Sequence, residues 1–283
     1  MEVSIITIVK NEADHIDRFL ESIVSQVYKE FEIIIVDDGS TDGTLEKIAR
    51  FDDPRLRCIS APRGRGVGFL RNVGLQHAKG EFVFFTDGDC APSRYWIKEG
   101  LRLFNSETCV GIEGRTFYLY RTNITISDYN TETLFPGNYM TCNMAYRREI
   151  LEEVGFFDPK FDYGHEDRDL AIRVKEKGKI IYAPDMLVCH QEKKLTAKSV
   201  LTRAMRAKNA VYLLRKHGTG KRWGARIIYP SHLLIIICPF LLISHYSYRS
   251  AKDVQIGLIK YVSLIIERFV IWYAAVKFRV FLL

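Results

Sequence analysis

The segment Phe82-Val83-Phe84-Phe85-Thr86-Asp87-Gly88-Asp89 is a continuous apolar run followed at once by two carboxylates. A run of this length without polar alternation is typical of a strand buried on both faces. Gly88 permits a tight backbone between the two acids. Carboxylates at positions i and i+2 can turn toward one divalent cation, and Mg²⁺ or Mn²⁺ in turn binds phosphates. The segment therefore predicts a buried strand with a candidate metal site beyond its end.

The surrounding sequence alternates strand-length apolar runs with apolar residues at helical spacing. The runs lie at 4–9, 31–36, 56–59 and 180–183, and the helical patterns lie at 16–27, 45–49, 70–78 and 166–177. Strands without a polar face, alternating with helices, predict an α/β fold with a mostly parallel sheet covered on both sides.

Acidic residues follow two of the predicted strands. Asp37-Asp38 ends the second strand, and Asp87 to Asp89 ends the fourth, although 50 residues separate them. Ligands of open α/β sheets bind beyond the carboxyl ends of the strands, so both pairs are expected at one crevice. Asp37-Asp38 could form only a turn and a helix cap, or one of its carboxylates could bind a base or a ribose.

A third charged cluster is Gly164-His165-Glu166-Asp167-Arg168-Asp169-Leu170. Acids are favoured at the start of a helix, so the cluster is consistent with an ordinary helix N-terminus. A carboxylate here could also act as general base toward a hydroxyl.

The composition indicates an ordered protein with an uneven charge. Of 283 residues, 47% are hydrophobic, which leaves little room for disorder. Residues 193–226 contain eleven Lys or Arg and no acid, so the remaining 30 basic and 34 acidic residues balance at −4. The block is either a solvated helix face or a surface for an anionic partner.

The six cysteines have no paired spacing, which predicts free, mostly buried thiols in a reducing compartment.

The C-terminal part changes character. The sequence predicts a catalytic domain at 1–192, a basic amphipathic helix and connector at 193–226, with its helix at 195–215, and hydrophobic membrane-associated helices at 227–283. A cationic block before an apolar tail favours the cytoplasmic face of a membrane with an anionic surface. Packing of the tail on the core or on a second chain is the alternative. We see no secretory signal at the N-terminus.

Five motifs together resemble family 2 glycosyltransferases over roughly residues 1–190. They occur in the family's order at 36–44, Arg71-Asn72, 87–89, 143–148 and 166–170. The resemblance implies a GT-A fold, a nucleotide-sugar donor and an inverting transfer that depends on Mg²⁺ or Mn²⁺. Lys10 stands where an aromatic residue is common in the family.

The resemblance also implies roles for individual residues. Nucleotide binding is expected from Ile8, Asn11, Asp38, Arg65 and Asp87. Metal binding is expected from Asp89 and Asp87, with His190 where some members supply a third ligand. Asp167 is the expected catalytic base, with Glu166 beside the acceptor.

The predicted function is therefore sugar transfer to a lipid-linked or membrane-proximal acceptor. A nucleotidyltransferase is the main enzymatic alternative, but residues 7–12 lack a glycine-rich triphosphate loop, and no GxGxxG follows the first strand to indicate a dehydrogenase. A non-catalytic membrane scaffold is disfavoured because Asp87, Asp89 and Asp167 are all present. We expect no nucleic-acid partner, and salt-dependent binding to RNA rather than to anionic liposomes would contradict this.

Overall fold

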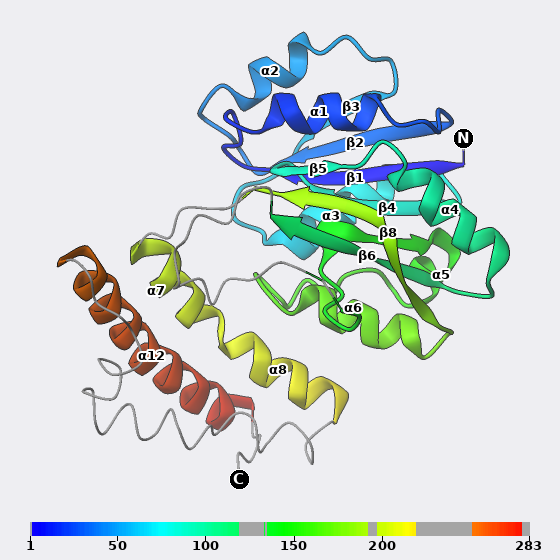
Figure 1. Ribbon diagram of the computed structural model, residues 1–283. Coiled ribbons are helices and arrows are strands. Elements are labelled where there is room, and N and C mark those ends of the chain that lie inside the picture. Colours follow the sequence, from blue (N-terminus) through cyan, green and yellow to red (C-terminus); the bar gives the residue numbers. More distant parts are fainter. Residues whose placement is uncertain (1, 119–132, 134, 192–196, 219–250, 279–283) are drawn as a thin grey trace. The chain divides into compact units, whose positions relative to one another are not determined.

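The computed structural model describes residues 2–118, 133, 135–191, 197–218 and 251–278 (Figure 1). The chain divides into two units, Met1–Glu192 and Lys193–Leu283. The predicted subdivision of the second unit into 193–226 and 227–283 stays a prediction, because residues 219–250 lie outside the described part.

The first unit is built on an eight-stranded sheet with the order β3-β2-β1-β4-β7-β6-β8-β5. The strands β1 to β4 are parallel to one another, and so are β6 and β8. Antiparallel pairing is confined to β7, between β4 and β6, and to β5 against β8. The predicted α/β class with a mostly parallel sheet is confirmed. The strand bounds are β1 Val3–Val9, β2 Phe31–Asp37, β3 Leu56–Ser60, β4 Phe82–Asp87, β5 Cys90–Pro92, β6 Gly111–Tyr118, β7 Met144–Arg147 and β8 Ile180–His190.

Helices cover both faces of this sheet because its central strands are apolar on both sides. Ile5 and Phe84 pack into one core cluster, whereas their neighbours Ile6 and Phe85 pack into the other. Full burial of each such side chain contributes roughly 1.5–3 kcal/mol, so both layers of helices are held by apolar contact. One layer comprises α1 (Ile16–Val24), α2 (Thr44–Arg50) and α4 (Trp96–Ser106); the other comprises α3 (Val67–His77), α5 (Arg148–Glu153) and α6 (Glu166–Lys175).

The second unit contains α7 (Ala197–Arg206), α8 (Lys208–His217) and α12 (Ala251–Phe278). The prediction of one basic helix over 195–215 is wrong, because the helix is interrupted at Ala207. The Ala207 N–H binds the carbonyl three residues back, at Ala204, instead of the fourth. Val211 of α8 packs with Ile271, Ala274 and Ala275 of α12.

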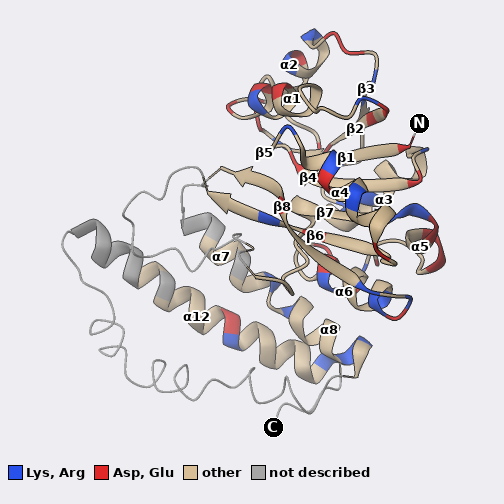
Figure 2. Cartoon of the chain, turned by 45° about the vertical axis from the view of Figure 1, so that its right-hand side comes forward, with Lys and Arg blue, Asp and Glu red and all other residues tan. Residues whose placement is uncertain are grey.

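Most of the described residues of α12 are neither acidic nor basic (Figure 2). Even so, none of the helices in the described ranges is both long enough and apolar enough to cross a membrane. The first part of the predicted hydrophobic tail, residues 227–250, lies outside those ranges.

The cysteines of the described part are free thiols, as predicted. Cys90, Cys109, Cys142 and Cys189 are buried, and Cys58 is partly buried. Cys238 belongs to the segment that is not described.

Candidate active site

The two acidic strand ends lie on either side of β1. Ile8 of β1 pairs with Val36 of β2 and with Asp87 of β4, and Val9 pairs with Asp37. Neighbouring strands are about 4.8 Å apart, so Asp37 and Asp87 flank the carboxyl end of β1 at roughly twice that distance. The two acidic strand ends thus share one edge of the sheet, and their facing one crevice stays a prediction.

Asp37 and Asp38 have different surroundings. Asp37 forms the turn, because its carboxylate accepts the N–H groups of Gly39 and Ser40 at 2.9 and 3.0 Å. The Asp38 carboxylate is held by Lys10 Nζ at 2.5 Å and by the Gly64 N–H at 3.1 Å. The hydroxyl of Tyr163 lies 3.4 Å from the same carboxylate. Asp38 is thus the residue that faces groups from other segments, as a nucleotide-binding role requires.

Two other predicted nucleotide residues, Asn11 and Arg65, lie in loops that contact this edge. Asn11, in the loop after β1, is tied to the loop after β2, since its side-chain oxygen accepts the Thr41 N–H at 2.8 Å. Arg65 is exposed and lies over the ring of Phe69, at 5.0 Å from its centroid. Arg63, which the sequence did not single out, packs against Gly39 at the strand end instead. Arg63 lies two residues before Arg65 in the same loop, and nucleotide binding by Arg65 stays a prediction.

The carboxylate of Asp87 faces Arg71 of α3. Arg71 Nη2 lies 3.4 Å from Asp87 Oδ1, and Arg71 Nη1 lies 2.9 Å from Glu166 Oε1. Gly88 is needed here for close approach, because a Cβ atom would lie 2.7 Å from Val9 Cγ1. The turn thereby sends Asp87 and Asp89 to different partners.

Asp89 belongs to a buried group with Cys90 and His190, whose candidate ligand atoms all lie within 4.8 Å of one another. The pairing of β5 with β8 sets Cys90 opposite His190, and His190 Nε2 lies 3.7 Å from Asp89 Oδ1. Asp87 is not part of this group.

This donor set fits a divalent cation through Asp89 and His190. His190 Nδ1 lies 2.7 Å from the carbonyl oxygen of Gln191, and a carbonyl can only accept, so Nδ1 carries the proton. In the neutral ring, the Nε2 lone pair then faces the Asp89 carboxylate, and a cation would separate these two electron-rich groups. Burial, together with a hydrogen bond to Cys142, raises the pKa of Cys90 well above its usual value, so Cys90 stays a thiol and is a poor ligand for Mg²⁺ or Mn²⁺.

Glu166 and Asp167 open α6 after His165, whose backbone is left-handed at φ 69°. Glu166 is buried, whereas Asp167 is partly exposed. Burial, reinforced by the neighbouring charge of Glu166, raises the pKa of Asp167 to about 7. A carboxylate whose pKa is near neutral is suited to take a proton from a hydroxyl. Asp169, the third acid, is instead paired with Arg173 at 2.7 Å within the helix.

Three contacts of this edge were absent from the sequence interpretation: Lys10 on Asp38, Tyr163 on Asp38, and Arg71 on Glu166. Only Lys10 and Arg71 carried a signal, the first as a departure from a family pattern and the second as a motif without an assigned role. Tyr163 lies in the loop before α6 and could not be identified by spacing.

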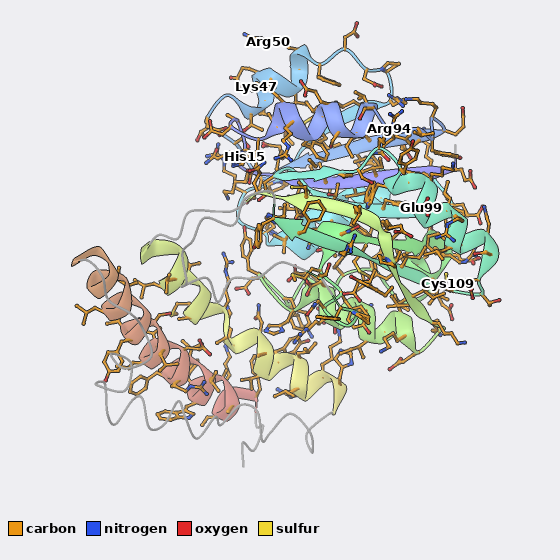
Figure 3. All side chains as sticks on the ribbon, in the orientation of Figure 1. His15, Lys47, Arg50, Arg94, Glu99 and Cys109 are labelled. Atoms are coloured by element: carbon orange, nitrogen blue, oxygen red, sulfur yellow. The ribbon has the colours of Figure 1, made fainter. Side chains whose placement is uncertain are left out.

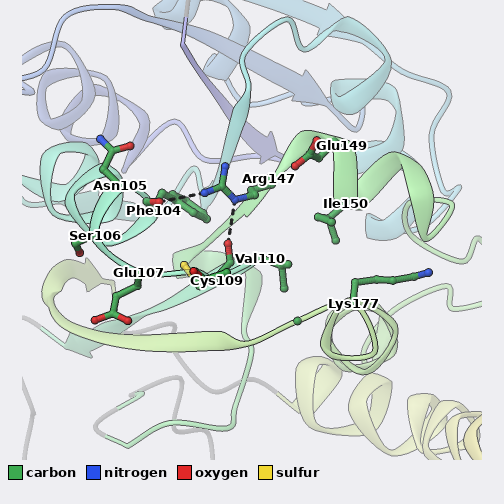
Figure 4. Close-up of a pocket in the computed structure, with 12 residues that line it drawn as sticks. Phe104, Asn105, Ser106, Glu107, Cys109, Val110, Arg147, Glu149, Ile150 and Lys177 are labelled. Carbon is green, nitrogen blue, oxygen red and sulfur yellow. Dashed lines mark hydrogen bonds between the residues drawn. The ribbon is translucent and has the colours of Figure 1, made fainter.

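A pocket of about 450 Å³ lies elsewhere, lined by residues such as Glu107, Arg147 and Lys177 (Figure 4). Arg147 pairs with Phe82, the first residue of β4, so the pocket is at the opposite edge of the sheet from Asp87. Its guanidinium binds the carbonyls of Phe104 and Cys109 at 3.1 and 3.0 Å, which is a structural role.

Comparison with known proteins agrees with this arrangement. The protein AglE of Haloferax volcanii, named a glycosyltransferase, is 28% identical over 202 residues, which is 66% of each chain and thus just under two thirds of that relative's length. The Escherichia coli protein WfaP, a "UDP-Glc:alpha-D-GlcNAc-diphosphoundecaprenol beta-1,3-glucosyltransferase", is 33% identical over 185 residues, 62% of this chain and 71% of its own.

Two solved structures share the fold. The mannosyltransferase PcManGT of Pyrobaculum calidifontis, in complex with GDP-Man and Mn²⁺, aligns with a TM-score of 0.61 at 20% identity, covering 96% of this chain and 87% of its own. Residues 1–349 of S. aureus TarS, in complex with UDP-GlcNAc, align with a TM-score of 0.59 at 18% identity, covering 83% and 79%. At such identities the likeness shows the GT-A fold alone.

The family model described as "Glycosyl transferase family 2" matches residues 4–155, which contain β1 to β4 and the strand ends at Asp38 and Asp89. That match spans more than half of the chain, and it decides against the nucleotidyltransferase alternative. The chain belongs to glycosyl transferase family 2.

Proposed function

We propose that this protein is an inverting, metal-dependent glycosyltransferase that moves a sugar from a nucleoside diphosphate to a hydroxyl of a lipid-linked or membrane-proximal acceptor. The observation that carries the proposal is the pair of contacts made by Arg71. Its guanidinium reaches Asp87, at the turn beside Asp89, and Glu166, beside Asp167. Candidate donor groups and candidate acceptor groups therefore lie within the span of one side chain.

The donor would lie across the carboxyl end of β1. Asp38 would accept a base N–H, with Ile8 and Asn11 lining the same edge. Lys10 and Arg63 bring positive charge to this end of the sheet, which suits an anionic ligand. Arg65 is a weaker candidate, because its side chain lies over Phe69 instead.

Asp89 and His190 are the residues that would hold Mg²⁺ or Mn²⁺. The ion would supply positive charge to the leaving diphosphate, where negative charge develops as the glycosidic bond breaks. The position of Asp87 on Arg71 favours a donor-side role for Asp87 that does not require direct metal contact.

Asp167 would act on the opposite side of the sugar. Its carboxylate would take the proton of the acceptor hydroxyl as that oxygen bonds to the anomeric carbon and the nucleoside diphosphate leaves. Attack from the face opposite the leaving group inverts the anomeric configuration. Glu166, anchored by Arg71, would orient the acceptor.

Association with the cytoplasmic face of a membrane is part of the proposal. Basic residues end α8, and α12 exposes apolar side chains at helical spacing, including Leu258, Val262, Phe269 and Tyr273. A helix with such a face lies well at a bilayer surface. The acceptor named for WfaP is a diphosphoundecaprenol-linked sugar, which also favours a lipid-linked acceptor here. If the proposal is right, the full chain should bind anionic liposomes at low salt and lose this binding at high salt. Salt-dependent binding to RNA instead of liposomes would favour a nucleic-acid partner.

The test of catalysis is release of nucleoside diphosphate from UDP-sugars and GDP-sugars with and without Mn²⁺. The proposal expects release that stops in EDTA, returns with Mn²⁺ and is abolished in Asp89→Ala. Asp52→Ala, in the exposed loop after α2, is the matched control and should retain activity. Activity that persists in EDTA, or that survives in Asp89→Ala, would refute the metal role.

A further inference from the structure

Arg71 is a buried cation whose function is not explained by packing alone. It lies on α3, and its side chain is 7% exposed. A guanidinium is costly to bury unless carboxylates pair with it, and here two carboxylates from different segments do so. Its Cζ also lies 5.6 Å from the centroid of the Phe157 ring.

The two ion pairs of Arg71 are unequal. The contact with Glu166 is 2.9 Å, and the Glu166 side chain is 6% exposed. The contact with Asp87 is 3.4 Å, and that side chain is 30% exposed. A short charge-assisted hydrogen bond between buried groups is much the stronger of the two. Arg71 is therefore anchored first on Glu166.

The other oxygen of Glu166 points to a ligand. Oε2 is buried and has no hydrogen-bond partner among the residues that the structure describes. A buried carboxylate oxygen without a donor is destabilising and rare in proteins, so it indicates a group that arrives with the substrate. A hydroxyl of the acceptor is a donor of the required kind.

The charges around Asp167 connect this arrangement to proton transfer. Besides burial, the negative charge of Glu166 opposes ionisation of Asp167, whereas Arg71 and then Arg168 favour it. Tyr146 also interacts electrostatically with Asp167, and burial raises the pKa of Tyr146 well above the usual value, so it stays neutral. Arg71 thus neutralises Glu166 and moderates its effect on Asp167.

We propose that Arg71 is a positioning residue of the transfer reaction: it holds one oxygen of Glu166, aims the second oxygen at the acceptor, and leaves Asp167 as the carboxylate that takes the proton. The inference rests on the proposed function and adds to it separate roles for two adjacent acids: Glu166 orients the acceptor, and Asp167 takes the proton. Without the guanidinium, the negative charge of Glu166 would oppose ionisation of Asp167 without this counterbalance, and Asp167 would be a less effective base at pH 7.

A brace between helices is the alternative role, and the chain offers an example of one. Arg173 of α6 pairs with Asp169 at 2.7 Å and binds the carbonyls of Val154 and Phe156. Loss of such a brace lowers stability but does not change how Asp167 ionises. Arg173→Met is therefore the matched control.

The experiment compares pH profiles of kcat/KM for nucleoside diphosphate release, together with thermal unfolding. In Arg71→Gln, which keeps a hydrogen-bond donor but no charge, we expect at least a tenfold loss of kcat/KM at pH 7 and a midpoint moved to higher pH. Arg71→Lys, which restores the charge, should return the midpoint toward that of the wild type. Arg173→Met should lower the Tm and leave the midpoint unchanged.

The inference is overturned if Arg71→Gln loses activity with an unchanged midpoint, as a brace would. If Arg71→Gln does not fold, Glu166→Gln decides, because removal of the negative charge next to Asp167 must move the midpoint to lower pH. Wild-type protein that releases no nucleoside diphosphate refutes the proposed function itself, and an active wild type with an unmoved midpoint refutes only the role of Arg71.

Discussion

The pKa of Asp167, about 7, makes a quantitative prediction about catalysis. A base must be ionised to accept a proton, so kcat/KM should follow the ionised fraction of Asp167. For a pKa of about 7 this fraction rises from about one tenth at pH 6 to about nine tenths at pH 8. Release of nucleoside diphosphate at saturating Mn²⁺ should therefore increase about tenfold between these values. An aspartate at its usual pKa of 3.8 would give a flat profile over the same range.

Asp167→Asn removes the titrating group and should reduce kcat/KM by about 10²–10⁴-fold at pH 8, the usual contribution of a general base. Asp52→Asn, exposed in the loop after α2, is the control and should retain the profile. A wild-type profile that is flat between pH 6 and pH 8 would refute the reasoning, and so would an Asp167→Asn variant with near wild-type activity.

The free energy of unfolding should also depend on pH through Asp167, and it should decrease as the pH rises. The native pKa of Asp167 lies above its usual value, so the folded state binds this proton more tightly than the unfolded chain does. Its contribution to the free energy of unfolding is fully present below about pH 4 and is lost as the pH rises through about 7, with a slope of at most about 1.4 kcal/mol per pH unit. Asp167→Asn should lack this dependence and be more stable than the wild type at pH 8 in chemical denaturation.

Three further substitutions test other parts of the site. His190→Ala should weaken Mn²⁺ binding by about 10-fold or more in calorimetry, because His190 Nε2 lies 3.7 Å from Asp89 Oδ1, whereas Asp52→Ala should not. Lys10→Met should weaken nucleoside diphosphate binding about tenfold, since it removes the cation on Asp38. Lys47→Met on α2 (Figure 3) breaks an equally short pair with Asp17 of α1 and should leave binding unchanged. Gly66→Ala should cost about 2–4 kcal/mol of unfolding free energy, because at a φ of +87° a Cβ atom would lie 2.3 Å from the Asp162 carbonyl oxygen. Gly64→Ala is the control and should cost about 1 kcal/mol, because Gly64 has a φ of +73° but open space around its Cα.

The first four strands could be predicted because their signal is local. Each is a short apolar run ended by polar residues, and the run Phe82 to Thr86 alone fixes a strand buried on both faces. The strand β7 was missed because Met144 to Arg147 is only four residues long and follows a short 3₁₀ turn. Its identity as a strand comes from pairing with β4 and β6, which no local pattern encodes.

The contacts of the site could be predicted only in part, for the same reason. The strand ends place Asp38 and Asp87 at one edge by topology alone. The pairing of Arg71 with Glu166 joins residues 95 positions apart, and that of Lys10 with Asp38 joins residues 28 positions apart. Neither distance in sequence reflects a periodicity, so the structure was needed to find both ion pairs.

The candidate metal site formed by Asp89 and His190 depends on the pairing of β5 with β8 as well as on the Asp87-Gly88-Asp89 turn. Asp87 ends β4 and Cys90 begins β5, yet β5 is hydrogen-bonded at the far end of the strand order, against β8. Three residues extend at most about 10 Å, so the half of the sheet formed by β7, β6 and β8 must curve back until the end of β8 meets this turn. This curvature of the sheet is what brings His190, at the end of β8, next to Asp89. A substitution that disrupts the pairing of β5 with β8 should therefore weaken metal binding with Asp89 and His190 both intact, which a site built from the turn alone would not do.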